Sequence, residues 1–91
     1  MYQICYTNRF KKELNRSIKR GLDISKLEKV IELLQNNGKL PTVYKPHLLK
    51  GKYSKCWECH IQPNWLLVWQ QNDTDLIILF MNTGTHTDLF D

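Results

Sequence analysis

Two apolar runs near the C-terminus limit most strongly what this chain can fold into. Residues 66–69 and 76–81 are apolar at every position, so each strand would be apolar on both faces. Strands of this kind lie in the middle of a sheet whose faces are covered. The polar sequence 71–74 between them is typical of a turn. The two runs therefore predict neighbouring antiparallel strands at the centre of the fold.

The first half of the chain has a different periodicity. Residues 2–6 alternate between apolar and polar, which predicts a short strand. A first helix is then indicated by apolar residues at every fourth position, and Gly21 would stop it. A second apolar stripe covers residues 27–34, with Ser25 and Glu28 spaced as a capping box. We expect this helix to end at Gly38 and to form an antiparallel hairpin with the first.

A further strand is expected at 56–62, and the next at 64–71, with a kink or bulge at Pro63. Residues 39–55 contain Pro and Gly and predict a loop or a ragged edge of the sheet. The fold class is thus α+β: an N-terminal strand, an antiparallel helical hairpin, and a three-stranded antiparallel meander that forms one small sheet. With 91 residues, the chain is expected to be a single domain over 1–91.

Composition excludes several classes of protein. The chain is 42% hydrophobic, which fits a globular domain rather than a disordered one. No run approaches the ~18 apolar residues of a membrane-spanning helix. Its N-terminus lacks the basic lead and long apolar run of a signal peptide. Three cysteines are an odd number, so we expect free thiols in a reducing cytoplasm.

Charge is divided sharply along the chain. All thirteen Lys and Arg lie between Arg9 and Lys55, together with four acids. Residues 56–91 carry five acids and no Lys or Arg. Such a division indicates a polyanionic partner, either phosphate or an acidic protein. The alternative is an ordinary solvated helix surface.

The sequence Cys56-Trp57-Glu58-Cys59-His60 matches the attachment pattern of haem c, but its context does not. In a strand, residues three apart point to opposite faces, so the two thiols could not attach to one haem. A zinc site is also not expected, because a second pair of ligands is missing. We predict strand cysteines, and no cofactor or metal.

The three histidines lie in segments punctuated by Pro or Gly, or beside strand ends. They are His47, His60 and His86. Histidine titrates near neutral pH, so three that converge would suit acid–base chemistry. Spacing alone leaves a second interpretation open, namely structural or solvent-exposed histidines.

Four blocks of sequence resemble the YafQ branch of the RelE-like bacterial toxins, nearly end to end. The blocks cover residues 6–14, 44–51, 58–68 and 83–90, and the last two are quite specific. The resemblance implies a helical hairpin on a small antiparallel sheet. It also implies the toxin of a type II toxin–antitoxin pair, which cleaves mRNA without a metal, typically on the ribosome. An antitoxin protein, mRNA and the ribosome would be its partners, and the bacterial cytoplasm its location.

Candidate site residues follow from the same resemblance. Catalytic residues of the family carry over to His47, His60, His86 and Phe90. A family aspartate falls at Asn64, which can hydrogen-bond but cannot act as a carboxylate base. Two family arginines fall at Trp57 and Asn82. These departures suggest a second function, a toxin-like module that holds an antitoxin or RNA but cuts poorly.

RNA chemistry explains how histidines could serve. The 2′-OH of RNA is the nucleophile, so a base, an acid and a cation complete the reaction. We expect His60 and His86 to transfer protons and His47 to bind phosphate. Besides the histidines, four residues are expected to contact RNA or phosphate: Lys45, Lys50, Lys52 and Trp57. Trp57 or Phe90 could stack on a base.

Overall fold

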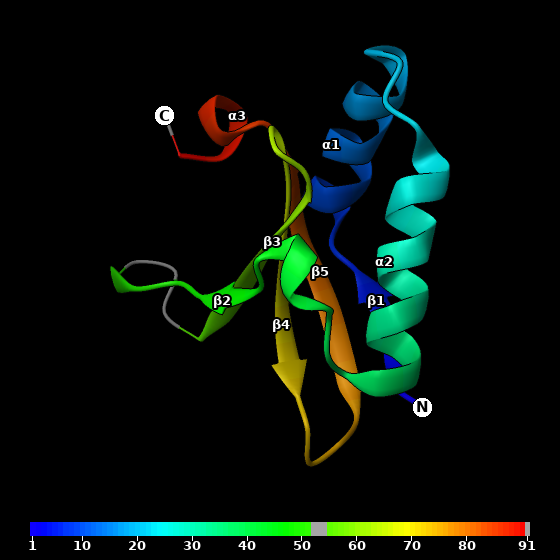
Figure 1. Cartoon of the computed structure of the whole chain (residues 1–91), viewed down its shortest axis with the longest axis vertical. Coiled ribbons are helices and arrows are strands. Elements are labelled where there is room, and N and C mark those ends of the chain that lie inside the picture. The colour runs from blue at the N-terminus through cyan, green and yellow to red at the C-terminus, as the bar shows by residue number, and fades with distance from the viewer. Residues whose placement is uncertain (52–54, 91) are drawn as a thin grey trace.

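A five-stranded mixed sheet forms the centre of the fold (Figure 1). The computed structural model describes residues 1–51 and 55–90. Its elements are, in order, β1 (Gln3–Tyr6), α1 (Asn8–Lys19), α2 (Ile24–Asn37), the 3₁₀ turn η1 (Thr42–Tyr44), β2 (His47–Leu48), β3 (Cys56–Gln62), β4 (Trp65–Asn72), β5 (Ile77–Gly84) and α3 (His86–Phe90). The strands lie in the order β1-β5-β4-β3-β2 in the described part of the chain.

The predicted meander is present as β3, β4 and β5, but the sheet is larger than expected. β1 pairs in parallel with β5, with Gln3 opposite Ile77, so the sheet is mixed rather than antiparallel. The connection from β1 to β5 passes through both helices and through β2, β3 and β4, so it is long enough for the crossover that a parallel pair requires. β2 adds a fifth strand beside β3, with His47 opposite Glu58. A strand of two residues is too short to show an alternation of apolar and polar residues. For this reason the sequence of 39–55 predicted only a loop or a ragged edge.

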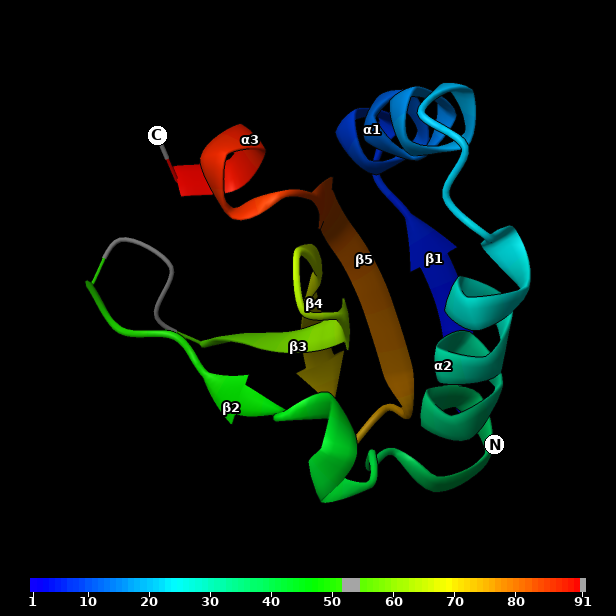
Figure 2. The same cartoon turned by 45° about the horizontal axis from the view of Figure 1, so that its top comes forward.

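Helices α1 and α2 lie on the same side of the sheet (Figures 1 and 2), and in Figure 1 α1 rises from the end of β1 while α2 descends. Their apolar residues and one face of the sheet enclose the main core, whose buried members are Phe10, Leu27, Val30, Leu34, Cys59, Ile61, Trp65, Leu67, Trp69, Ile78 and Phe80. Trp65 and Trp69 are among the largest fully buried side chains. The two apolar runs thus occupy the central strands β4 and β5, as the sequence predicted, except that Leu76 lies in the turn before β5 and is exposed.

Local capping fixes where each helix begins and ends. The Thr7 hydroxyl accepts a hydrogen bond from the Phe10 amide at 3.0 Å and caps α1. Asp23, not Ser25, caps α2: its carboxylate accepts from the Ser25 amide and hydroxyl, at 3.0 and 2.6 Å. The expected Ser25–Glu28 box was therefore wrong, because an acid two residues earlier took the capping position. Gly38 ends α2 with φ +66°, and a Cβ there would lie 2.6 Å from the Tyr2 ring.

The other face of the sheet carries a second, smaller apolar cluster. Its buried members are Cys56, Leu66, Val68 and Leu89, with Leu49 and Met81 packed against them. Cys56 thus faces away from Cys59, which belongs to the main core. This confirms that the two thiols cannot share one haem. Burial also raises the pKa of the Cys59 thiol to about 12, which disfavours its thiolate form at neutral pH.

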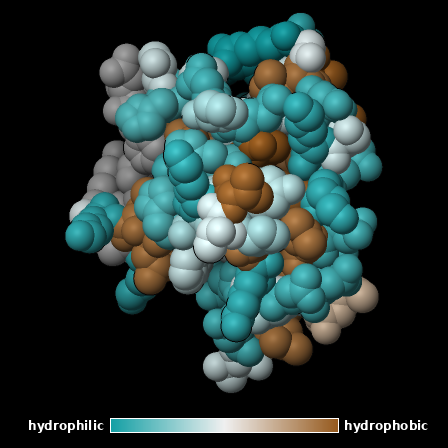
Figure 3. All heavy atoms as spheres, viewed as in Figure 1, coloured by the Kyte–Doolittle hydropathy of each residue, from teal (hydrophilic) through white to brown (hydrophobic). Residues whose placement is uncertain are grey.

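The surface is largely hydrophilic on the face shown in Figure 3, where apolar residues form small separate patches. Among the described residues, no helix has the length and hydrophobicity needed to cross a membrane. In both ribbon views, α3 and β2 lie on the side of the sheet away from α2 (Figures 1 and 2). That side, with α3 at one end, carries the candidate site.

Candidate active site

One end of the sheet gathers the segments that carry two of the three histidines. β3 ends there, β4 begins there, and β5 ends there. In the register of these strands, His60 lies opposite Leu66, and Leu66 lies opposite Gly84. His86 follows Gly84 by two residues, at the start of α3. The topology therefore brings the end of β3, with His60, and the start of α3 to the same end of the sheet.

His47 lies on β2 at the edge of the sheet, with about half of its side chain exposed. Its Nε2 is 3.3 Å from Oε1 of Glu58, the residue directly opposite on β3. Its Nδ1 is 2.9 Å from the backbone oxygen of Lys45. Both ring nitrogens thus face oxygen acceptors, one on the Glu58 side chain and one on the backbone.

Glu58 is the site residue that our sequence reasoning missed. Its side chain is buried, and its second oxygen, Oε2, has no hydrogen-bond partner among the described residues. By the alternation of a strand, Glu58 shares the face of Cys56 and His60. A buried carboxylate needs a compensating partner, and in the described part of the chain His47 lies beside it. The sequence did contain one signal of this site: a glutamate at an inward-facing position of the predicted strand 56–62.

His60 is partly buried near the end of β3, just before the turn into β4. Its Nδ1 is 3.3 Å from the backbone oxygen of Pro63. The pairing of β3 with β4 shifts register between His60 and Gln62, so the bulge expected at Pro63 lies just before it. Together with Ile61, His60 lines a hollow of about 340 Å³ that also involves Val43, Tyr44, Lys45, Gln62 and Pro63. Asn64 is exposed in the adjoining turn.

His86 is exposed and is the first residue of α3, which Phe90 ends. Leu89 anchors this short helix in the smaller cluster, on the face that also carries Glu58. Of the predicted lysines, Lys45 and Lys50 are exposed near His47, whereas Lys52 lies outside the described residues.

The structure does not bring Trp57 together with the histidines. Its ring faces the main core and stacks on Trp69, with centroids 6.3 Å apart. There it lines a second hollow, of about 340 Å³, beside the end of α2. No group of three or more His, Cys, Asp or Glu side chains in residues 1–51 and 55–90 is placed to hold a metal ion.

Comparison with known proteins decides the family. The model of the family described as the bacterial toxin of type II toxin–antitoxin systems, YafQ, matches residues 2–91. This chain belongs to the YafQ toxin family. The mRNA interferase toxin YafQ of Escherichia coli strain K12 is 37% identical over 86 residues, which cover 93% of this chain and 91% of that protein.

Solved structures of YafQ agree with this fold. The crystal structure of YafQ from E. coli strain BL21(DE3) matches with a TM-score of 0.92 at 34% identity, over 100% of both chains. YafQ in the crystal structure of the E. coli DinJ–YafQ complex matches with a TM-score of 0.90 at 35% identity, again over 100% of both chains. This chain is therefore a type II toxin related to the YafQ mRNA interferase.

Asn82 occupies one of the positions at which the YafQ resemblance implies an arginine, and its side chain is bound to α1. Asn82, on β5, donates from Nδ2 to Oε1 of Glu13 on α1 at 3.1 Å. Glu13 also accepts from the Thr83 amide and lies 3.6 Å from the Arg9 guanidinium. The amide of Asn82 is neutral, so it cannot supply the charge of an arginine at this place.

Proposed function

We propose that this chain is a metal-independent endoribonuclease that cleaves mRNA, on the ribosome and in the bacterial cytoplasm. Family membership supports the toxin role, because a relative with 37% identity is an mRNA interferase. The observation that carries the proposal is the gathering of His60 and His86 at one end of the sheet, with His47 opposite the buried Glu58. RNA needs only general acid, general base and a cation for cleavage through its own 2′-OH.

In this proposal, His60 and His86 form the proton-transfer pair. One removes the proton from the 2′-OH, and the other protonates the departing 5′-oxygen. Both side chains reach the surface at the end of the sheet, where RNA can approach. The rigid strands that precede them limit their movement, which is what acid–base catalysis requires.

His47 would act as a cation toward the phosphate. Its contacts with Glu58 and with the Lys45 carbonyl hold the ring at the sheet edge. When protonated, the ring would add positive charge beside the developing negative charge of the phosphorane-like transition state. Further positive charge would come from Lys45, Lys50 and Lys52, in place of the family arginines.

The remaining predicted residues have supporting roles. Asn64, next to Pro63, would orient a group by hydrogen bonds, and Phe90 at the end of α3 would stack on a base. The hollow beside His60 is large enough for part of a nucleotide. Trp57 is not included, because it faces the main core on the other side of the sheet.

The partner that we propose is a co-encoded antitoxin. A YafQ relative has been crystallised with the antitoxin DinJ. In this chain, all Lys and Arg lie in the segment of the two helices and the following loop. We propose that an acidic antitoxin binds this basic surface, with charge attraction speeding its association.

Purified protein incubated with mRNA, with and without ribosomes, tests the proposal. Cleavage that persists in EDTA on ribosome-free RNA, or that requires intact ribosomes, would support an endoribonuclease. The second candidate, a module that holds antitoxin or RNA without cutting, is favoured by the neutral Asn64 and Asn82. Tight binding of RNA with no cleavage under either condition would select it.

A further inference from the structure

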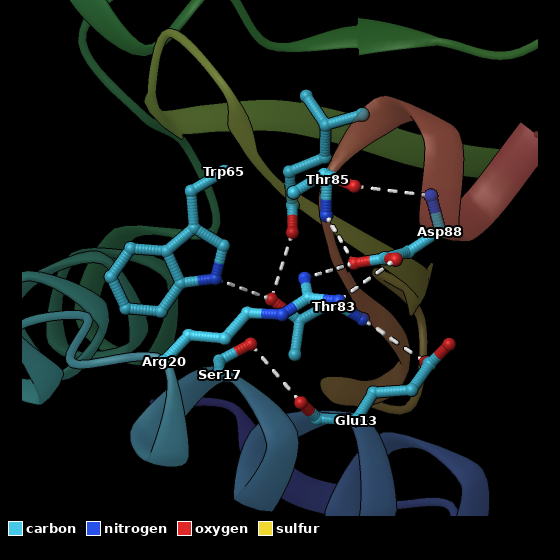
Figure 4. Close-up of polar contacts among 8 residues, drawn as sticks. Glu13, Ser17, Arg20, Trp65, Thr83, Thr85 and Asp88 are labelled. Carbon is cyan, nitrogen blue, oxygen red and sulfur yellow. Dashed lines mark hydrogen bonds and ion pairs between the residues drawn. The ribbon is translucent and has the colours of Figure 1, made fainter.

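The helix that carries His86 is too short to be stable by itself and must be held by its neighbours. Leu89 provides one anchor, since it is buried against Leu66 and Val68. Asp88 provides another, on the side of the helix that faces α1 (Figure 4). Because His86 is two residues before Asp88, whatever fixes Asp88 also fixes the position of the imidazole.

Asp88 first caps its own helix. The Thr85 amide donates to Asp88 Oδ2 at 3.0 Å, and the Asp88 amide donates to Thr85 Oγ1 at 3.1 Å. This reciprocal pair is a capping box with aspartate as its acid. Gly84, just before, has φ +155°, and a Cβ there would lie 3.0 Å from Asp88 Oδ2. A glycine is therefore needed for the carboxylate to approach the turn.

Asp88 also binds Arg20, which is the C-cap residue of α1. Arg20 donates from Nη1 to Oδ2 at 2.6 Å and from Nη2 to Oδ1 at 3.3 Å. A two-point contact between guanidinium and carboxylate fixes orientation as well as distance. The Asp88 side chain is only 15% exposed, and Arg20 together with Thr85 holds its pKa well below the usual range. The pair is thus fully charged at neutral pH.

We infer that Arg20 and Asp88 form a clamp between α1 and α3 that sets the position of His86. They are positioning residues, since they act through His86 rather than on the RNA. This inference rests on the proposed ribonuclease function. It predicts that α1, which is remote in sequence from the histidines, controls the rate of cleavage.

The test compares four variants: Arg20→Gln, Arg20→Lys, Asp88→Asn, and Arg20→Gln combined with Asp88→Asn. Single-turnover cleavage at saturating protein should slow by about 10-fold or more in the first and third, because small displacements of a catalytic group are costly. Arg20→Lys should recover part of the rate. The double variant should be no slower than the slower single variant, since the two single substitutions break the same contact between Arg20 and Asp88.

Glu32→Gln is the matched control. It removes a carboxylate from another ion pair, that of Lys29 and Glu32 at 4.0 Å on α2. It should keep the wild-type rate and the wild-type resonance of His86. Affinity for a non-cleavable RNA, carrying 2′-O-methyl groups, should be unchanged by Arg20→Gln.

A spectroscopic measurement separates this inference from the proposed function. The ring Cε1–H resonance of His86 should shift in Arg20→Gln and in Asp88→Asn, even if the wild-type protein cleaves no RNA. Failure of cleavage in the wild type would contradict the proposed function alone. The clamp is refuted if the His86 resonance and the rate are both unchanged in Arg20→Gln. It is also refuted if Arg20→Gln weakens RNA binding without moving the resonance, because Arg20 would then contact RNA directly.

Discussion

Replacing His86 by alanine separates catalysis from packing most clearly. The side chain is exposed at the start of α3, so its removal should change the free energy of unfolding by less than about 0.5 kcal/mol. If His86 is the acid or the base, the cleavage rate should fall by roughly 10²-fold or more, which is about 2.7 kcal/mol in the transition state. The loss of rate would then greatly exceed the loss of stability.

Single-turnover cleavage, thermal unfolding and antitoxin binding should be measured on the same preparations. Leu89→Ala is the contrasting variant, because Leu89 is 7% exposed and its truncation should cost about 2–5 kcal/mol of stability. A His86→Ala protein that unfolds like Leu89→Ala would show that the histidine is structural. One that folds and cleaves at the wild-type rate would show that His86 is not catalytic.

Three further predictions address other parts of the account. Asn64→Asp should raise cleavage near neutral pH by about 10-fold, if a positioned carboxylate assists as general catalysts do, and an equal or lower rate in a folded variant would mean that the histidines alone set it. Thr83→Val should lower the melting temperature, because the Thr83 hydroxyl accepts from Trp65 Nε1 at 2.9 Å and donates to the Leu66 carbonyl at 2.8 Å in the core. The free energy of unfolding should fall by about 1–3 kcal/mol. Each kcal/mol lowers the melting temperature of a domain of this size by roughly 4–8 °C, and an unchanged melting curve would contradict the prediction. High salt should slow antitoxin association more than it speeds dissociation in stopped-flow experiments, and equal association rates at low and high salt would exclude steering by the basic surface.

Much of the fold could be predicted from the sequence, because periodicity reports burial. The run at 66–69 and residues 77–81 of the second run lie in central strands, and Gly38 ends α2, as the sequence indicated. Strand pairings that produce no periodic pattern in the sequence could not be predicted. β2 has two residues, and β1 pairs with β5, the last strand of the chain, which follows all the other strands.

The candidate site was predictable only as a set of residue types. Histidines in turn-like segments and the resemblance to a toxin family pointed to His47, His60 and His86. Neither could reveal that Glu58 lies opposite His47, because that contact depends on the register of a short edge strand. Trp57 was expected beside the site, but a residue between Cys56 and Glu58 faces the opposite side of a strand.

The central claim, attack by the RNA's own 2′-OH with histidines as acid and base, is tested most directly by analysis of the cleaved ends. Mass spectrometry of the products of a defined mRNA should find a 2′,3′-cyclic phosphate on one fragment and a 5′-hydroxyl on the other. A 2′-deoxy nucleotide at the scissile position should block cleavage at that bond. A 3′-hydroxyl with a 5′-phosphate, or cleavage next to the deoxy nucleotide, would show that water is the nucleophile and would contradict the account.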